Sequence, residues 1–214
     1  MSHAMKPDKY DGKIDQNYKF TFQWEDHPDS LAPFVPSPLN IVRGMLQLAD
    51  LKSNDILYDL GCGDGRILFI AIDEFQIQKA VGYEINPRMV EELERKIMEK
   101  GMAKKIFVEN KNFMHANLGE ASVITLYLTT SGNVKLKPKL EKELKSGSRV
   151  VSHDFPIHGW TTVNFDGTPF TIGSHKIFIY QIPDCYKREI VIQRTDEEEN
   201  KWRRIRNHFT QVNF

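Results

Sequence analysis

The stretch ILYDLGCGDGRILFI, residues 56–70, decides the fold of this chain. An apolar run ends in Asp59 and Leu60, three glycines follow within five positions, and a second apolar run begins after Arg66. Glycine permits a positive φ and lets a ligand approach the backbone closely. A buried strand that passes through such a turn into a helix is typical of ligand-binding α/β proteins. The stretch therefore predicts a strand–turn–helix unit with a ligand site at the turn.

The rest of the chain continues this alternation of periods. Asn86 and Pro87 predict the start of a long helix that Gly101 ends. Ser37 and Pro38 predict an N-cap hydroxyl and the first position of an earlier helix. Alternating strands and helices favour a mostly parallel sheet that is covered on both faces. Strands are predicted at residues 56–60, 79–85, 105–110, 121–128 and 148–155, with one or two more over 170–182, and helices at residues 66–75 and 87–100 and over a segment ending at Gly147.

Composition narrows the class of protein. The chain has 214 residues, with 29 Lys and Arg against 29 Asp and Glu, so bulk charge favours neither nucleic acid nor an anionic membrane as a partner. Cys62 and Cys185 stand far apart and in no metal-type spacing. No apolar run approaches membrane-spanning length. We expect a reduced, cytoplasmic, monomeric protein.

Three parts of the chain differ in composition. Residues 1–33 form a polar N-terminal arm with scattered aromatic residues, of which 1–4 resemble a cloning remnant before a native Met5. Residues 34–182 form the α/β domain. Residues 183–214 form a charged extension, in which EIVIQ is a candidate edge strand and NKWRRIRNHF a short helix or basic cluster. The arm is either a surface segment or a lid over the site.

Two phosphate-binding interpretations of the turn fail. A dinucleotide site favours G-x-G-x-x-G, whereas the chain has G-x-G-x-G followed by Arg66. Asp59 and Asp64 flank the turn, and two carboxylates repel a pyrophosphate. No Gly-Lys-Ser/Thr follows, so a Walker-type loop is excluded as well.

S-adenosylmethionine suits the turn better because it carries a sulfonium and an ammonium in place of phosphate. Glu84 stands 19 residues after Gly65, close to the offset of about 20 residues for ribose-binding acids. Asn112 and Phe113 offer a polar contact and an apolar surface for adenine. The helix start at Ser37 offers donors for a carboxylate.

These residues also carry a family resemblance. YDLGCGDGR resembles motif I of the class I, seven-strand S-adenosylmethionine methyltransferases. FVPSPLNIVRGML, AVGYEINPR, NKNF and LKPKLEKELKSGSRVVSHDFPIHGW together resemble the small archaeal protein-lysine methyltransferases, over residues 34–182. The resemblance implies a Rossmann-like, doubly wound, seven-stranded and mostly parallel sheet with an antiparallel C-terminal strand. It also implies protein lysine as the substrate.

The resemblance carries roles over to single residues. The cofactor's methionine part would lie among the turn residues, its ribose at Glu84 and its carboxylate near Ser37. Leu128 and Thr129, in YLTTS, would line the reaction site, although the threonines depart from the related branch, where this segment is apolar or amide-bearing. The implied cofactor-binding set is Ser37, Asp59, Gly61, Gly63, Asp64, Glu84, Asn112, Phe113 and Leu128.

Methyl transfer to lysine needs a neutral amine. With a pKa near 10.4, roughly one lysine in a thousand is neutral at pH 7, and an apolar channel beside a cation favours that form. Tyr127, Phe155 and Trp160 are candidate channel residues, each with core packing as the alternative, and complete the catalytic set with Thr129. His153, Asp154 and His158 suggest a proton relay or a loop hydrogen bond. The histidines show no closed ligand spacing, so no metal is expected.

Two other classes of function remain open. An RNA or small-molecule methyltransferase would share the fold, although YLTT lacks the Asn/Asp-Pro-Pro-aromatic motif of amino-methylating enzymes for adenine or glutamine. KWRRIR is a candidate basic-aromatic cluster for RNA, or a solvated helix face. A non-catalytic cofactor-binding module is the third class, and the intact glycine turn argues against it.

Overall fold

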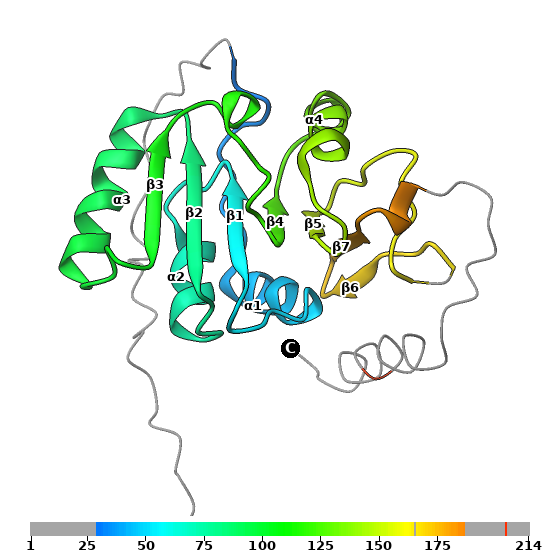
Figure 1. Ribbon diagram of the computed structural model, residues 1–214, viewed down its shortest axis with the longest axis horizontal. Helices are drawn as coiled ribbons and strands as arrows, with labels where there is room; N and C mark the ends of the chain where they lie inside the picture. Colours follow the sequence, from blue (N-terminus) through cyan, green and yellow to red (C-terminus); the bar gives the residue numbers. More distant parts are fainter. Residues whose placement is uncertain (1–28, 165, 187–203, 205–214) are drawn as a thin grey trace, which may run out of the picture.

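The computed structural model describes residues 29–164, 166–186 and 204, and these contain a seven-stranded sheet with helices on both faces (Figure 1). The strand order is β3-β2-β1-β4-β5-β7-β6. All neighbours pair in parallel except β7, which runs antiparallel to β5 and β6. The predicted doubly wound, seven-stranded sheet with an antiparallel C-terminal strand is confirmed.

The elements follow the predicted alternation of strand and helix. The strands are β1 (Ile56–Leu60), β2 (Lys79–Glu84), β3 (Ile106–Asn110), β4 (Val123–Leu126), β5 (Arg149–His153), β6 (Phe170–Ile172) and β7 (His175–Gln181). The helices are α1 (Leu39–Leu48), α2 (Arg66–Asp73), α3 (Pro87–Glu99) and α4 (Thr130–Glu143), with short 3-10 turns η1 (Phe113–His115) and η2 (Asp184–Tyr186).

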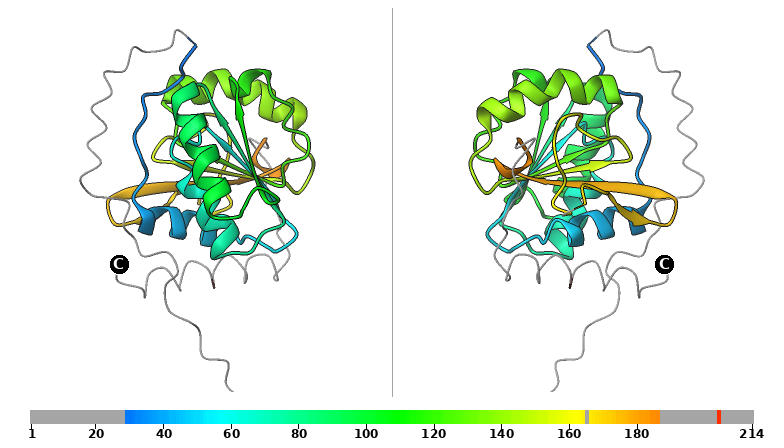
Figure 2. Two further views of the ribbon diagram at one scale, coloured as in Figure 1. Left: turned by 90° about the vertical axis from the view of Figure 1, so that its left-hand side faces the viewer. Right: turned by 90° about the vertical axis from the view of Figure 1, so that its right-hand side faces the viewer.

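Two apolar clusters fix the helices to the sheet. On one face, α1, α2 and α3 pack on inward residues such as Leu57 and Ile179. On the other, Leu136 and Leu140 of α4 pack with Ile124. Figure 2 shows the sheet edge-on, with α1 and α2 on one side and α4 on the other. Successive residues of a strand point to opposite faces, so each central strand contributes side chains to both clusters. Both faces of the central strands are therefore buried.

The order of the strands reverses between β1 and β4, since the chain moves outward to β3 on one side and to β5 on the other. In open α/β sheets, ligands bind outside the carboxyl ends of the strands at such a reversal. The glycine turn follows β1 at this edge. The fold therefore places the turn where a ligand site is expected.

Local signals located α3 well and α1 less well. Asn86 caps α3 as predicted, because its side chain accepts hydrogen bonds from the backbone N–H groups of Arg88 and Met89. The predicted N-cap at Ser37 is wrong: Pro38 occupies the cap of α1, and no side chain caps that end. The Ser37 hydroxyl instead bonds to His153, far away in the sequence.

The predicted end of α4 at Gly147 is also wrong. The helix runs from Thr130 to Glu143 with Pro138 inside it, and Gly147 lies in the following turn with a φ of 87°. The candidate edge strand over 189–193 and, apart from Arg204, the candidate helix over 200–209 lie outside the described residues. Among the described helices, none has both the length and the apolar character needed to cross a bilayer.

Gly65, at the start of α2, has a positive φ of 77°, and a Cβ there would overlap the Leu93 side chain of α3. We expect Gly65→Ala to lower the free energy of unfolding by about 2–4 kcal/mol, from backbone strain plus overpacking. Gly101 has a φ of 68° but open space around it, so Gly101→Ala should lose only about 1 kcal/mol from strain. Urea unfolding of both variants measures the difference, and equal losses would contradict close packing of α2 on α3.

Candidate active site

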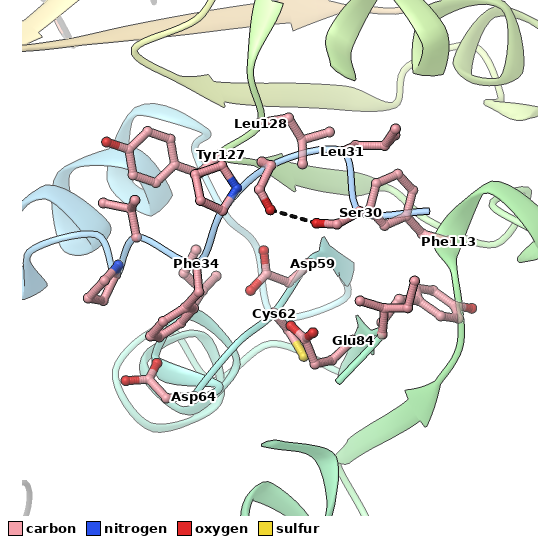
Figure 3. Close-up of a pocket in the computed structure, with 18 of the residues that line it drawn as sticks. Ser30, Leu31, Phe34, Asp59, Cys62, Asp64, Glu84, Phe113, Tyr127 and Leu128 are labelled. Atoms are coloured by element: carbon pink, nitrogen blue, oxygen red, sulfur yellow. Dashed lines mark hydrogen bonds between the residues drawn. The ribbon is translucent and has the colours of Figure 1, made fainter. Parts of the chain in front are cut away.

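A pocket lies at the carboxyl ends of β1, β2 and β4, and the segment 29–37 closes one side of it. Figure 3 shows the Asp59 carboxylate in the middle of this pocket, with Leu128 and Leu31 on one side of it and Glu84 on the other. Tyr127 and Leu128 directly follow β4, which ends at Leu126. Strand ends that are far apart in the sequence thus meet around one cavity.

The glycine turn is tied to the end of β2 by its backbone. The carbonyl oxygen of Tyr83 accepts hydrogen bonds from the N–H groups of Gly61 (2.9 Å) and Cys62 (3.0 Å). Gly61 and Gly63 have φ angles of 89° and 53°, a region that side-chain-bearing residues rarely adopt. The turn needs glycine because its path is left-handed at these positions.

Glu84 connects the same turn to α3. One carboxylate oxygen accepts a hydrogen bond from the Gly63 N–H and the other accepts one from the Asn86 N–H, both at 2.9 Å. The side chain is buried, yet it lines the pocket. A carboxylate oxygen has two acceptor positions, so each oxygen keeps one position for a ligand hydroxyl.

Asp59 is a buried carboxyl group, and no cationic partner contacts it among the residues that the structure describes. It is 4% exposed and accepts a hydrogen bond of 2.8 Å from the Thr125 hydroxyl. Burial raises the pKa of Asp59 to about 7, the Thr125 bond opposes this, and the charges of Asp64 and Glu84 add to it. A cation placed in the pocket would favour the ionised form.

Asp64 differs from Asp59 because it has a cationic partner. The Arg66 guanidinium donates to both oxygens of the Asp64 carboxylate, and its remaining nitrogen donates to the carbonyl oxygen of Ser37 at 2.7 Å. The pair therefore fixes the segment before α1 against the turn. The charge of Asp64 is largely balanced by Arg66, so Asp59 presents more uncompensated negative charge to the pocket.

The segment 29–37 forms a wall of the pocket. The sequence placed Ser37 at the site and left the arm up to residue 33 as either a surface segment or a lid, but it did not single out Phe34. Phe34 lies against Gly63, where any Cβ would overlap the ring. The hydroxyl of Thr129 donates to the carbonyl oxygen of Leu31 at 3.0 Å, and the Thr129 hydroxyl oxygen accepts from the Gly132 N–H at 3.1 Å. Thr129 is thus the N-cap of α4 and lies outside the pocket lining. Phe34 could have been found from the sequence, because it is an aromatic residue three positions before Ser37.

The adenine candidates lie across the pocket. Asn112 and Phe113 both line it. The Asn112 oxygen accepts a hydrogen bond from the Met114 N–H at 2.9 Å and caps η1, which leaves its amide N–H groups for a ligand. Phe113 is buried and presents an apolar surface. The lining also includes residues that the sequence did not single out, namely Cys62, Tyr83, Ile85 and Lys111.

The three aromatic channel candidates are not equally placed. Tyr127 lines the pocket. The Phe155 ring lies 6.4 Å from the Tyr127 ring, outside the lining. Trp160 is buried against Tyr180 and Tyr186, and its indole N–H donates to Glu141 at 2.9 Å. Trp160 thus has the core-packing position that was its alternative.

His153 is completely buried at the end of β5. Its Nδ1 lies 2.9 Å from the Ser37 hydroxyl, and its Nε2 lies 2.9 Å from Nδ1 of His175. Burial lowers the pKa of His153 to about 4, against the opposing effect of Asp154. The neutral imidazole is therefore the dominant form near pH 7, and it holds Ser37 at the pocket wall.

The residues around this pocket fit S-adenosylmethionine. A methionine ammonium or sulfonium matches the unbalanced charge of Asp59, and a ribose diol matches the free acceptor positions of Glu84. Gly61 leaves open space beside its Cα, where a ligand can lie against the backbone. The two carboxylates, of Asp59 and Glu84, would repel a pyrophosphate.

Comparison with known proteins agrees with this chemistry. The ANTKMT methyltransferase domain matches residues 59–164. A protein-lysine N-methyltransferase of Saccharolobus islandicus is 43% identical over 70% of this chain and 93% of its own length. The mouse adenine nucleotide translocase lysine N-methyltransferase is 29% identical over 70% of this chain and 63% of its own length.

A solved structure shares the same architecture. An RNA methyltransferase from Salinibacter ruber, crystallised with S-adenosyl-L-homocysteine, is 35% identical, with a TM-score of 0.67 over 72% of this chain and 98% of that one. High identity over nearly the whole of the archaeal relative decides the family. The chain belongs to the S-adenosylmethionine-dependent methyltransferases that carry the ANTKMT methyltransferase domain.

Proposed function

We propose that this enzyme transfers a methyl group from S-adenosylmethionine to the side-chain amine of a lysine in a protein substrate. The observation that carries the proposal is the pocket built by the glycine turn, Asp59 and Glu84, in a chain 43% identical to a protein-lysine N-methyltransferase. The charge and hydrogen-bonding groups of the pocket support the cofactor. The relative supports the acceptor.

We assign the cofactor contacts as follows. Glu84 binds the ribose hydroxyls through its free acceptor positions, and Asp59 faces the ammonium of the methionine part. Asn112 and Phe113 hold the adenine. Gly61 and Gly63 let the cofactor lie on the turn, and Leu128 covers it from the β4 side. Asp64 and Ser37 act as positioning residues, because the Arg66 bonds link both to the turn.

The protein's part in the reaction is alignment and desolvation. S-adenosylmethionine supplies an activated methyl group on a good leaving group. Tyr127 and Leu128, after β4, form the side of the pocket from which an acceptor amine approaches. Burial and the nearby Asp154 raise the pKa of Tyr127, which keeps its hydroxyl neutral. An apolar, neutral wall favours the uncharged amine that attacks the methyl group.

RNA is the second candidate acceptor, because the Salinibacter ruber structure is described as an RNA methyltransferase. Nucleic-acid binding relies on clustered Lys and Arg, whereas this chain carries 29 acidic and 29 basic residues. The higher identity of the lysine methyltransferase also favours protein.

Four accompanying expectations stay predictions: the domain bounds at residues 34 and 182, the monomeric state, the cytoplasmic location and the absence of membrane binding. Cys62 and Cys185 are buried free thiols, which agrees with a reducing compartment.

The end of the N-terminal arm packs on the domain. Leu31 and Ala32, just before the predicted domain bound at residue 34, contact the apolar cluster under α4.

Removal of Glu84 should weaken cofactor binding. We expect Glu84→Ala to raise the Kd for S-adenosylmethionine by about 10- to 100-fold, because hydrogen bonds to a charged group contribute about 1.5–3 kcal/mol. Glu120→Ala is the matched control, since Glu120 is exposed and forms a 3.6 Å ion pair with Lys79 away from this pocket. Calorimetry measures both, with thermal melting to confirm folding. An unchanged Kd in folded Glu84→Ala would remove Glu84 from the site.

Asp59 should make cofactor binding depend on pH. Its carboxyl has a pKa of about 7, so below that value a cation must bind a protonated, neutral group and release its proton. Affinity for S-adenosylmethionine should rise by up to about tenfold per pH unit from pH 5.5 to 7, where the ammonium of the cofactor stays charged. Asp59→Asn should bind more weakly and abolish this slope.

The raised pKa of Asp59 should also make the stability of the cofactor-free protein depend on pH. Its raised pKa means that the folded, cofactor-free protein binds the proton more tightly than the unfolded chain does. The stabilisation is complete below the ordinary Asp pKa of about 3.9 and is lost as the pH rises towards 7. Asp59→Asn keeps an oxygen for the Thr125 bond and should stabilise the free protein at pH 8 by at least about 1 kcal/mol. A destabilised variant would contradict the raised pKa.

The acceptor can be identified directly. We expect label from methyl-labelled S-adenosylmethionine to enter proteins of a cell extract and to appear as methyl-lysine after hydrolysis to amino acids. Glu84→Ala enzyme is the negative control. Label released by nuclease would replace protein with RNA as the substrate, and label in small molecules would replace both.

A further inference from the structure

Three side chains outside the pocket lining converge where β5 ends and β7 begins. His153 is the last residue of β5, Asp154 follows it, and His175 is the first residue of β7. Nε2 of His153 lies 2.9 Å from Nδ1 of His175, which lies 2.9 Å from an Asp154 carboxylate oxygen. That oxygen lies 3.4 Å from Nε2 of His153. The three atoms form a closed triangle.

Protons alone satisfy this triangle poorly. A ring nitrogen has one in-plane position, which holds either a proton or a lone pair. With a proton, Nδ1 of His175 can donate fully to only one of its two neighbours at 2.9 Å. With a lone pair, it faces the carboxylate oxygen of Asp154, which is also an acceptor. No arrangement of ring protons gives a full hydrogen bond along both short edges.

One metal cation satisfies all three atoms at once. The circle through the three atoms has a radius of about 1.8 Å, shorter than the usual zinc–ligand distance of about 2.0–2.1 Å. An ion slightly off their plane can therefore lie at bonding distance from each. Ligands at right angles or tetrahedral angles on such an ion are about 2.8–3.4 Å apart, close to the observed separations.

Hydrogen bonds to neighbouring groups orient two of the three ligands, His153 and Asp154. The Ser37 hydroxyl lies 2.9 Å from Nδ1 of His153, so that nitrogen can carry the proton while Nε2 keeps its lone pair. The Lys176 N–H donates to the other oxygen of Asp154 at 2.9 Å. Partners of this kind on imidazole and carboxylate ligands are usual around metal ions.

Backbone and ring packing hold the arrangement in place. Asp154 has a φ of 58°, an uncommon conformation for a residue other than glycine. The Tyr127 ring stacks on the His153 ring at 3.9 Å between centroids, and its hydroxyl lies 3.4 Å from the same Asp154 oxygen. His153 and Asp154 are therefore held in position by their surroundings.

We propose that His153, Asp154 and His175 bind one divalent transition-metal cation of the class that takes imidazole and carboxylate ligands, such as zinc. The ion would join the end of β5 to the start of β7. It would also brace the pocket, because Ser37 and Tyr127 line the pocket and contact the metal ligands. The proposal departs from the expectation of no metal, which was based on the spacing of the histidines along the chain. His175 lies 22 residues from His153, and the fold brings the two together.

The test is a calorimetric titration of the metal-depleted, full-length chain with Zn²⁺ alone. We expect one ion per chain and a Zn²⁺-dependent rise in Tm, because an ion that binds only the folded state stabilises it. His175→Gln, which removes one ligand from the start of β7, should raise the Kd at least tenfold and abolish the rise in Tm. His158→Gln is the matched control, since His158 is exposed and lies in the same HDFPIH segment.

A second probe guards against a folding defect in the variant. Co²⁺ bound by nitrogen and oxygen ligands gives visible absorption bands, which we expect in the wild type and His158→Gln and not in His175→Gln. Thermal melting without metal shows whether His175→Gln folds. If it does not fold, Asp154→Asn, which keeps the shape of the side chain, takes its place as the ligand variant. Absence of stoichiometric Zn²⁺ binding, or binding that is equal in the wild type and the ligand variant, would overturn the proposal.

Discussion

The hydrogen bonds between the glycine turn and the end of β2 are the constraint on which the pocket depends. The Tyr83 carbonyl accepts from Gly61 and Cys62, and the Glu84 carboxylate accepts from Gly63. Leu60 of β1 pairs with Tyr83 in the parallel register. Because side chains alternate along a strand, a slip of one residue would turn Glu84 away from the turn. The register of two buried strands thus sets the carboxylate of the site.

The turn in its own right positions a distant part of the chain. Arg66 joins Asp64 to the carbonyl oxygen of Ser37, and Phe34 lies over Gly63 in the space that a side chain would fill. At the other end, Thr129 holds the Leu31 carbonyl at the start of α4. The segment 29–37 is therefore fixed from both β1 and β4, the two strands that flank the reversal of strand order.

The sequence predicted what is local and missed what is not. The Asn86 cap was located because its partners lie within three residues, and the glycine turn because its left-handed path itself requires glycine. Glu84 followed from its spacing, and the strand count from a family resemblance. Ser37 was misread because its partner, His153, comes from β5, and the packing of Trp160 depends on Tyr180 in β7. Such contacts join elements that are far apart in the sequence, and no local motif encodes them.

The two aspartates of the turn illustrate how one motif serves both fold and ligand. Asp64 is neutralised by Arg66, and the pair secures the segment that closes the pocket. Among the described residues, the partner of Asp59 is the Thr125 hydroxyl, and burial raises the pKa of Asp59 to about 7. A buried carboxylate destabilises the free protein as it ionises, and a bound cation reverses that penalty. The negative charge that weakens the empty fold is therefore the charge that favours a cationic cofactor, and only Asp59, not Asp64, supplies it.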